Sequence, residues 1–220
     1  MTISIAFSGA MFAWPYQAGV AAYVQDRGLL DDTSRIYGTS SGAAVAMMLA
    51  CGLDIARAAF PLALDANERA GWFRPGGVIP TYIAAFLPVL PLDAAKRATG
   101  RLFVAITKLP LFRRAHVSDY TTAGDVLDAL AGSMALPGIT VRIAHKSVRH
   151  GWCVDGGPVA GGDERPDTRT IRVGVGPLRG NDDIVPSRRI GWRERSQFAS
   201  RASREAMFEL GHADARSYLG

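Results

Sequence analysis

The stretch RIYGTSSGAAVAMMLAC (residues 35–51) decides the fold, because a serine flanked by glycines separates two different patterns. RIY (35–37) has the short apolar pattern of a buried strand, and the residues after the turn are apolar on all sides, as in a helix buried at the centre of a domain. Nucleophilic serine hydrolases place the serine on such a turn, where the helix N-terminus directs its N–H groups at developing negative charge. The pattern predicts that Ser40 is a nucleophile between Gly38 and Gly42, with an ordinary glycine and serine turn as the alternative.

The regions on either side of this turn alternate between strand and helix patterns. ISIAF (3–7) is typical of a buried strand, and the helix after it is expected to begin near Pro15 and to end at Gly28. Alternating strands and helices indicate an α/β fold, and a chain of 220 residues with 48% hydrophobic residues favours a single domain. Further strands are predicted at 101–109, 140–144, 151–155 and 169–176, and further helices at 122–135 and 195–219.

The composition limits the classes of function. A formal net charge of +5 favours anionic partners, either phospholipid headgroups or nucleic acid. The sequence has no Walker-type loop, no Cys and His cluster with metal-ligand spacing and no pattern typical of nucleic-acid binding, so we expect no metal, no cofactor and no nucleic-acid partner. Two cysteines are too few for a disulfide framework and MTISIAF lacks the features of a secretory signal, so a cytoplasmic location is expected. The longest apolar stretches, 42–53 and 79–92, are shorter than the roughly 20 residues that cross a bilayer.

A serine hydroxyl needs a base to take its proton. Asp155 lies in WCVDGG (152–157), after apolar residues that would bury it and raise its pKa toward the range useful for proton abstraction. The same Asp-Gly-Gly step is also an ordinary turn. A triad of Ser40, Asp155 and His212 is a second possibility, although none of the four histidines follows a strand in an obvious catalytic loop.

Seven blocks of the sequence together resemble one family, the patatin-like lipid acyl hydrolases, and most of all its adiponutrin and adipose-triglyceride-lipase branch. They follow the family's order and cover essentially the whole chain, so that 1–220 is expected to be one patatin-like domain. The resemblance implies a three-layer α/β/α sandwich in which Ser40 is the nucleophile and Asp155 is its base. The blocks are SIAFSGAMFAWPYQAGV (4–20), GTSSGAAVA (38–46), TGRLFVAITKL (99–109), DVLDALAGSMALPG (125–138), WCVDGG (152–157), TIRVGVGPLRGNDDIVPS (170–187) and ELGHADARSYL (209–219).

The resemblance also implies an oxyanion hole formed by backbone N–H groups of Gly9, Ala10 and Met11, in a loop where the family has more glycines. A positive φ at either non-glycine residue would cost about 1 kcal/mol or more. A second departure from the family is Gly161, where its members carry asparagine. The implied function is a serine esterase or lipase that hydrolyses fatty-acyl esters of glycerolipids, either acylglycerols or phospholipids. The alternative is a lipid-binding or regulatory protein whose altered loop has weakened its turnover.

Three features are candidates for lipid contact. The aromatic residues Phe12, Trp14 and Tyr16 are expected to pack in the core or to border an acyl chain. The apolar stretch 79–92 is expected to enter a lipid interface or to form a buried helix pair. The segment 188–204 carries six arginines, which suits either anionic lipid or a solvated helix face. Peripheral association with a membrane or a lipid droplet is the corresponding expectation.

Overall fold

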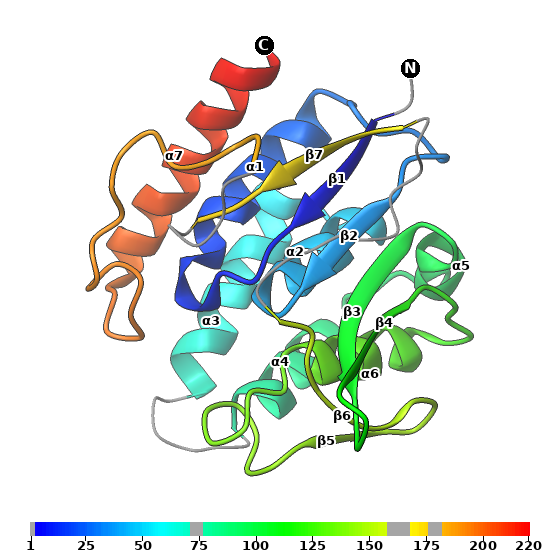
Figure 1. Cartoon of the computed structure of the whole chain (residues 1–220). Helices are drawn as coiled ribbons and strands as arrows, with labels where there is room; N and C mark the ends of the chain where they lie inside the picture. The colour runs from blue at the N-terminus through cyan, green and yellow to red at the C-terminus, as the bar shows by residue number, and fades with distance from the viewer. Residues whose placement is uncertain (1–2, 71–76, 158–167, 176–181) are drawn as a thin grey trace.

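The computed structural model describes residues 3–70, 77–157, 168–175 and 182–220. Within them the centre of the fold is a seven-stranded sheet in the order β5-β6-β3-β2-β1-β7, with β4 added beside β3 (Figure 1). The strands are β1 (Ile3–Phe7), β2 (Ile36–Thr39), β3 (Leu102–Lys108), β4 (Arg113–Val117), β5 (His145–Ser147), β6 (Gly151–Asp155) and β7 (Arg169–Val173).

The middle of the sheet is parallel and one side of it is antiparallel. β7, β1, β2 and β3 run parallel to one another, whereas β4 and β6 both pair antiparallel with β3. Parallel neighbours need a crossover connection, and the helices between β1, β2 and β3 provide it. The expected α/β fold, with a central sheet and flanking helices, is confirmed.

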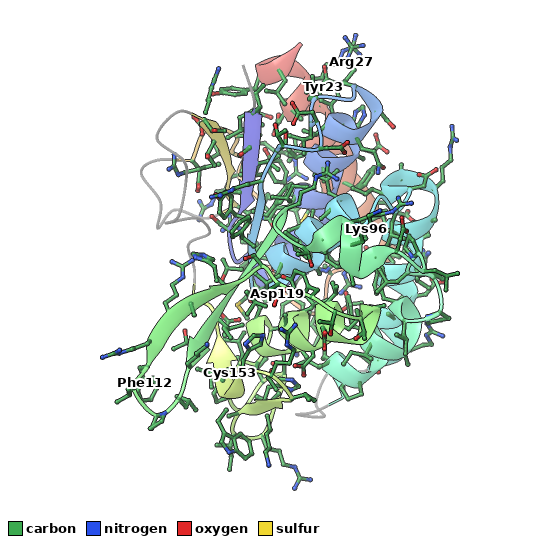
Figure 2. The ribbon with its side chains drawn as sticks, turned by 90° about the vertical axis from the view of Figure 1, so that its right-hand side faces the viewer. Tyr23, Arg27, Lys96, Phe112, Asp119 and Cys153 are labelled. Atoms are coloured by element: carbon green, nitrogen blue, oxygen red, sulfur yellow. The ribbon has the colours of Figure 1, made fainter. Side chains whose placement is uncertain are left out.

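The described helices gather on one face of this sheet, where they lie to the right of the strands in Figure 2. All ten residues of α2 are buried, as the apolar sequence after Ser40 predicts for a central helix. The helices are α1 (Trp14–Asp26), α2 (Ser41–Ala50), α3 (Phe60–Ala70), α4 (Val78–Phe86), α5 (Ala94–Ala98), α6 (Ala123–Ser133) and α7 (Arg201–Leu219), with a 3-10 turn at Met11–Ala13 and a π-helical turn at Ile55–Ala59.

The opposite face of the sheet carries a small apolar cluster of its own, formed by Ala6, Tyr37 and Phe103. The guanidinium of Arg35 lies 4.8 Å from the centre of the Phe103 ring, a cation–π contact. Among the described residues, side chains of this kind rather than helices cover this face.

Two boundaries differ from the sequence prediction. Residues 140–144 do not form a strand, because the Thr140 hydroxyl accepts a hydrogen bond from Leu136 N–H (2.8 Å) and holds this segment in a turn. The strand that pairs with β6 is β5 instead. The last helix begins at Arg201, where the Ser200 side chain caps it, and not at 195. The sequence analysis did not predict β4 and α3.

The first and last helices, α1 and α7, approach closely through two glycines. A Cβ atom on Gly19 would lie 1.9 Å from the carbonyl oxygen of Phe208, and one on Gly211 would lie 1.9 Å from that of Tyr16. The Tyr16 hydroxyl also donates a hydrogen bond to Asp214 on α7 (3.1 Å). Because α1 also borders α2, this contact supports the helix that follows Ser40.

We therefore expect Gly211→Ala to lower the free energy of unfolding by about 2 kcal/mol or more, because the added methyl group forces the two backbones apart. The control is Gly124→Ala on α6, where the nearest atom to an added Cβ is 3.4 Å away. That change should leave stability unchanged or raise it by about 0.5–1 kcal/mol. Urea unfolding of both variants measures the difference, and equal effects would contradict the close contact.

Candidate active site

Ser40 lies on a strained turn between β2 and α2. Its φ is 55° and its ψ is −132°, a combination that residues other than glycine rarely adopt. Backbone strain of this kind costs about 1–3 kcal/mol and persists only where the surrounding structure enforces it. The turn places the serine at the N-terminus of α2, as the elbow of a serine hydrolase does, and Ser40 itself is only 7% exposed.

Gly38 and Gly42 allow this turn to form. A Cβ atom on Gly42 would lie 2.4 Å from the carbonyl oxygen of Phe7, and one on Gly38 would lie 2.5 Å from the Cα of Ala43. The first turn of α2 therefore packs directly on the end of β1. This is the crowding that the sequence pattern led us to expect the two glycines to relieve.

Strand register brings Asp155 to the same end of the sheet as Ser40. Thr39, the residue before the serine, pairs with Ala105 of β3, and the next residue of β3, Ile106, pairs with Asp155 of β6. A Cβ on Gly156 would lie 2.2 Å from the Ala105 carbonyl oxygen, so the Asp-Gly-Gly step follows β3 closely. The structure thus brings the two predicted catalytic residues together across one strand.

The Asp155 carboxylate is buried with few hydrogen bonds to its oxygens. Its Oδ1 accepts a hydrogen bond from Gly157 N–H (2.8 Å). Its Oδ2 is buried and makes no hydrogen bond of normal length and angle to any described residue. Burial raises the pKa of Asp155, and weaker hydrogen bonding from the Ser40 side chain and from Gly157 opposes that rise. Hydroxyl-to-base contacts are often loose in a free enzyme and tighten with substrate. A carboxylate in this setting is suited to accept a proton.

Ser133, at the end of α6, links the two halves of the site. Its hydroxyl oxygen accepts a hydrogen bond from Ser40 N–H (2.9 Å), and its carbonyl accepts one from Gly156 N–H (3.4 Å). The side chain is fully buried. By resemblance, the block LAGSMALPG (130–138) is expected near the site as part of the architecture, but no role is predicted for Ser133 itself, because its partners are far away along the chain.

The loop after β1 contains the three residues of the expected oxyanion hole. Met11 has a φ of 48°, so positive φ occurs there, whereas Ala10 has a φ of −125°. The N–H of Ala10 already donates to the hydroxyl of Ser41 (3.1 Å). Gln17 holds the start of the loop by donating to the Ser8 carbonyl (2.7 Å), next to Gly9. The Ala10 group is therefore not free to face a substrate in this structure, and Ser41 is a further polar residue of the site.

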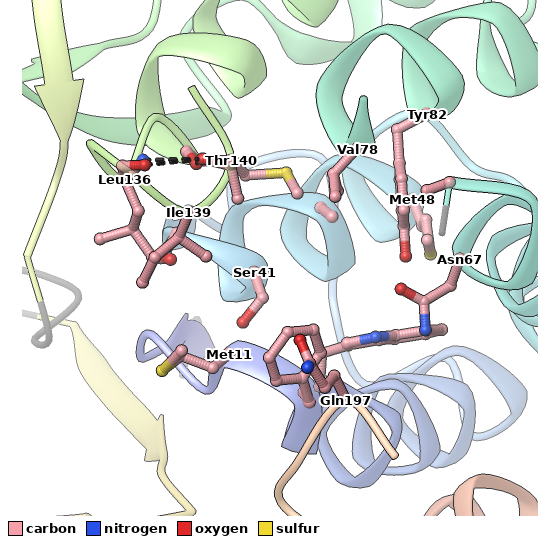
Figure 3. A pocket seen from close by; sticks show the side chains of 16 residues that line it. Met11, Ser41, Met48, Asn67, Val78, Tyr82, Leu136, Ile139, Thr140 and Gln197 are labelled. Carbon is pink, nitrogen blue, oxygen red and sulfur yellow. Dashed lines mark hydrogen bonds between the residues drawn. The ribbon is translucent and has the colours of Figure 1, made fainter. Parts of the chain in front are cut away.

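An apolar pocket opens beside Ser40 and encloses about 840 Å³, part of it open to solvent (Figure 3). It follows α2 past Ser41, Ala44 and Met48. Phe12 and Trp14 line it, whereas Tyr16 is fully buried in the core, so the expected aromatic group divides between the two roles. The other lining residues are Met11, Asn67, Ala70, Val78, Tyr82, Met134, Leu136, Ile139, Thr140 and Gln197.

The histidine of the alternative triad lies elsewhere. His212 is 3.9 Å from the Asp26 carboxylate and stacks edge-on with Tyr23, at the C-terminal end of α1. The pocket borders Trp14 at the other end of that helix, roughly 14 Å away along its axis. Of the other histidines, His145 binds Asp128 (2.8 Å). No histidine is among the residues that line the pocket.

The described part of the chain contains no group of three or more His, Cys, Asp or Glu side chains arranged to hold a metal ion. It also contains no helix that is long and apolar enough to span a bilayer. Gly161, the departure noted beside the aspartate, lies outside the described residues.

The site therefore combines a strained serine at a strand-to-helix turn, a buried carboxylate beside it and an apolar pocket that the serine lines, in an α/β protein. Residues 5–161 match the sequence model of the family described as patatin-like phospholipase. This match covers more than half of the chain, and the chain therefore belongs to the patatin-like phospholipase family. Membership supports lipid-ester hydrolysis as the general class of activity.

Two relatives illustrate the match. Human omega-hydroxyceramide transacylase is 30% identical over 192 residues, which cover 83% of this chain and 35% of that protein. Human patatin-like phospholipase domain-containing protein 2 is 28% identical over 193 residues, which cover 84% of this chain and 38% of that protein. The expected likeness to the adiponutrin and adipose-triglyceride-lipase branch is confirmed. The chain spans little more than a third of the length of these relatives.

Among solved structures, VipD from Legionella pneumophila aligns with a TM-score of 0.49 at 13% identity, over 82% of this chain and 51% of that chain.

The raised pKa of Asp155 predicts a stability change in Asp155→Asn. An aspartate in the unfolded chain has a pKa of about 3.9. The stability that a raised pKa contributes is therefore complete below that value and is lost as pH rises through the folded pKa. Asp155→Asn has no carboxyl group to lose this proton. The free energy of unfolding of the variant minus that of wild type should therefore increase as pH rises from the unfolded to the folded pKa of Asp155. Urea unfolding of both proteins between about pH 4 and pH 8 tests this. A difference in unfolding free energy that does not change with pH would contradict it.

Proposed function

We propose that residues 1–220 form a lipid acyl hydrolase domain that cleaves fatty-acyl esters of glycerolipids through a dyad of Ser40 and Asp155. The observation that supports it most strongly is the strained Ser40 turn beside the buried Asp155 carboxylate, at one end of an apolar pocket. The pocket would hold the acyl chain, and Ser40 would meet its ester carbonyl. No metal or cofactor takes part in this proposal.

In the proposed mechanism, Asp155 takes the proton of the Ser40 hydroxyl while the serine oxygen attacks the ester carbonyl. The tetrahedral intermediate collapses to an acyl-serine, and the alcohol leaves with the proton that Asp155 held. Water, deprotonated by the same carboxylate, then attacks the acyl-serine, and the fatty acid is released as Asp155 returns that proton to the Ser40 oxygen. The raised pKa of Asp155 makes the carboxylate a stronger base than an exposed aspartate.

Two sets of N–H groups are available for the oxyanion in this proposal. The loop after β1 contributes Met11, and the N-terminus of α2 contributes first-turn N–H groups, which have no partner four residues back within the helix. Ala10 acts indirectly, because its N–H bonds to Ser41 and fixes the loop against α2. The same contact is the observation that favours the second candidate, a lipid-binding protein with weak turnover, since one expected donor is occupied.

The acyl group can pass to water or to an acceptor alcohol, because both attack an acyl-serine in the same way. The relative named as a transacylase fits the second route, and the relative named as phospholipase domain-containing fits the first. We propose hydrolysis, because the pocket that Ser40 lines is partly open to solvent.

We also propose that the domain works at a lipid surface. Met11 and Ile139 line the pocket and are each 49% exposed, so they form an apolar rim. Phe198, next to the lining residue Gln197, is 66% exposed. The arginines of 188–204 contribute less to this surface than the sequence suggests, because Arg188 pairs with Glu194 and Arg204 is buried.

The test of the function is hydrolysis of acylglycerols and phospholipids in mixed micelles by the full chain. We expect Ser40→Ala and Asp155→Asn each to lower kcat by about 10³-fold or more, because nucleophile and base act as a unit. The control is His212→Ala, which removes a polar side chain outside the pocket and should keep wild-type turnover. Activity that survives Asp155→Asn would refute the dyad, and a folded wild type that binds lipid without turnover would favour the second candidate.

Ser41 is expected to be a positioning residue for the loop. Ser41→Ala leaves Ala10 N–H without its buried partner, so kcat should fall by about tenfold to a hundredfold with little change in KM. Ser41→Thr keeps the hydroxyl and should restore most of the rate. Unchanged turnover in Ser41→Ala would show that the bond from Ala10 N–H to Ser41 does not position the loop. Faster turnover would show that Ala10 N–H stabilises the oxyanion when this bond is absent.

A further inference from the structure

The end of the pocket remote from Ser40 is polar, although most of the pocket is apolar. Asn67 of α3 and Tyr82 of α4 both line it there, and their side chains are only 7% and 5% exposed. Figure 3 shows the Asn67 amide and the Tyr82 hydroxyl directed toward one another at this end, near Met48. A lipid pocket built only for a hydrocarbon chain has no use for two such groups.

The Asn67 amide is not fully satisfied within the described part of the chain, because its Nδ2 atom is buried there without a hydrogen-bond partner. A buried polar group without a partner costs about 1–3 kcal/mol. The fold therefore bears a penalty at this end of the pocket that a polar ligand would remove.

The two side chains that line this end are neutral, although the buried Arg204 guanidinium lies near Tyr82. Burial raises the pKa of Tyr82, so its hydroxyl stays protonated and can donate a hydrogen bond at physiological pH. The nearby Arg204 is buried and donates to the Gln197 carbonyl (3.0 Å). The amide N–H group can donate a hydrogen bond to a ligand while the phenol oxygen accepts one from it. One partner that meets both demands is a hydroxyl group.

The helix α2 gives the distance between this end and the nucleophile. Ser41, Ala44 and Met48 line the pocket in succession, and Met48 lies about 10 Å along the axis from Ser41. An extended hydrocarbon chain covers that span in about eight carbon–carbon bonds. A group bound between Asn67 and Tyr82 would therefore belong to the middle of a long acyl chain whose ester carbonyl lies at Ser40.

We propose that Asn67 and Tyr82 form a subsite for a hydroxyl group near the middle of the acyl chain, so that the domain prefers hydroxylated acyl chains to plain ones. This inference rests on the proposed function, because it takes the pocket as the acyl site. The ligand hydroxyl accepts a hydrogen bond from Asn67 Nδ2 and donates one to the Tyr82 hydroxyl oxygen. A plain chain in the same place leaves Asn67 Nδ2 without a partner.

The test is binding rather than turnover, so that it does not depend on catalysis. Full-length Ser40→Ala is titrated with two isomers of hydroxyoctadecanoic acid, one hydroxylated near mid-chain and one next to the carboxyl group. The isomers have the same composition and nearly the same polarity. We expect the mid-chain isomer to bind about tenfold more tightly, which corresponds to about 1.4 kcal/mol.

Two substitutions in the Ser40→Ala background test whether Asn67 and Tyr82 bind the hydroxyl group. Tyr82→Phe and Asn67→Leu keep the shape of the side chain and should each reduce the tenfold preference to about threefold or less. The matched control is Tyr23→Phe, which removes a buried tyrosine hydroxyl at the far end of α1 and should keep the preference. Circular dichroism identifies a variant that does not fold, and Tyr82→Phe alone then decides.

Each outcome distinguishes the two proposals. If both isomers bind equally well, the subsite is refuted and the acyl pocket stands. If neither isomer binds, the acyl pocket itself, and with it the proposed function, is in error. If the preference survives both Tyr82→Phe and Asn67→Leu, the hydroxyl is recognised elsewhere and the assignment to these two residues is overturned.

Discussion

The contact between the first turn of α2 and the end of β1 sets the geometry of the whole site. Gly42 lies so close to the carbonyl groups of Phe7 and Ser8 that no side chain fits between them. This approach holds Ser40 at its positive φ and brings Ser41 within hydrogen-bonding distance of Ala10. Ser40 and the loop after β1 are therefore positioned by one packing constraint.

The site also concentrates interactions that are unfavourable for folding. Ser40 is strained, Asp155 Oδ2 is buried without a complete hydrogen bond, and Asn67 Nδ2 has no partner among the described residues. Such groups usually gather where a protein binds or converts a ligand, because a ligand or a transition state can satisfy them. The remainder of the fold offsets this cost, chiefly through the buried α2 helix and the close α1–α7 contact.

Local sequence patterns predicted the elements that rely on local chemistry. The strand at Ile3–Phe7, the helix that starts with Pro15 and the turn at Ser40 all depend on residues a few positions apart. The parts that the sequence did not reveal are long-range. Ser133 reaches Ser40 across 93 positions, and Ser41 reaches Ala10 across 31. The segment at 140–144 has an apolar strand pattern, yet the Thr140 hydroxyl holds it in a turn. The position of Asn67 near Tyr82 depends on how α3 and α4 pack, which no spacing in the sequence indicates.

The central claim is that Ser40 is an activated nucleophile, and labelling with a fluorophosphonate probe tests it most directly. The purified full chain is treated with the probe, and the modified residue is mapped by mass spectrometry with Ser40→Ala as the control. The account predicts a single phosphonylated residue, Ser40, and no labelling of the control. A folded protein that is not labelled, or that is labelled equally in Ser40→Ala, would contradict it.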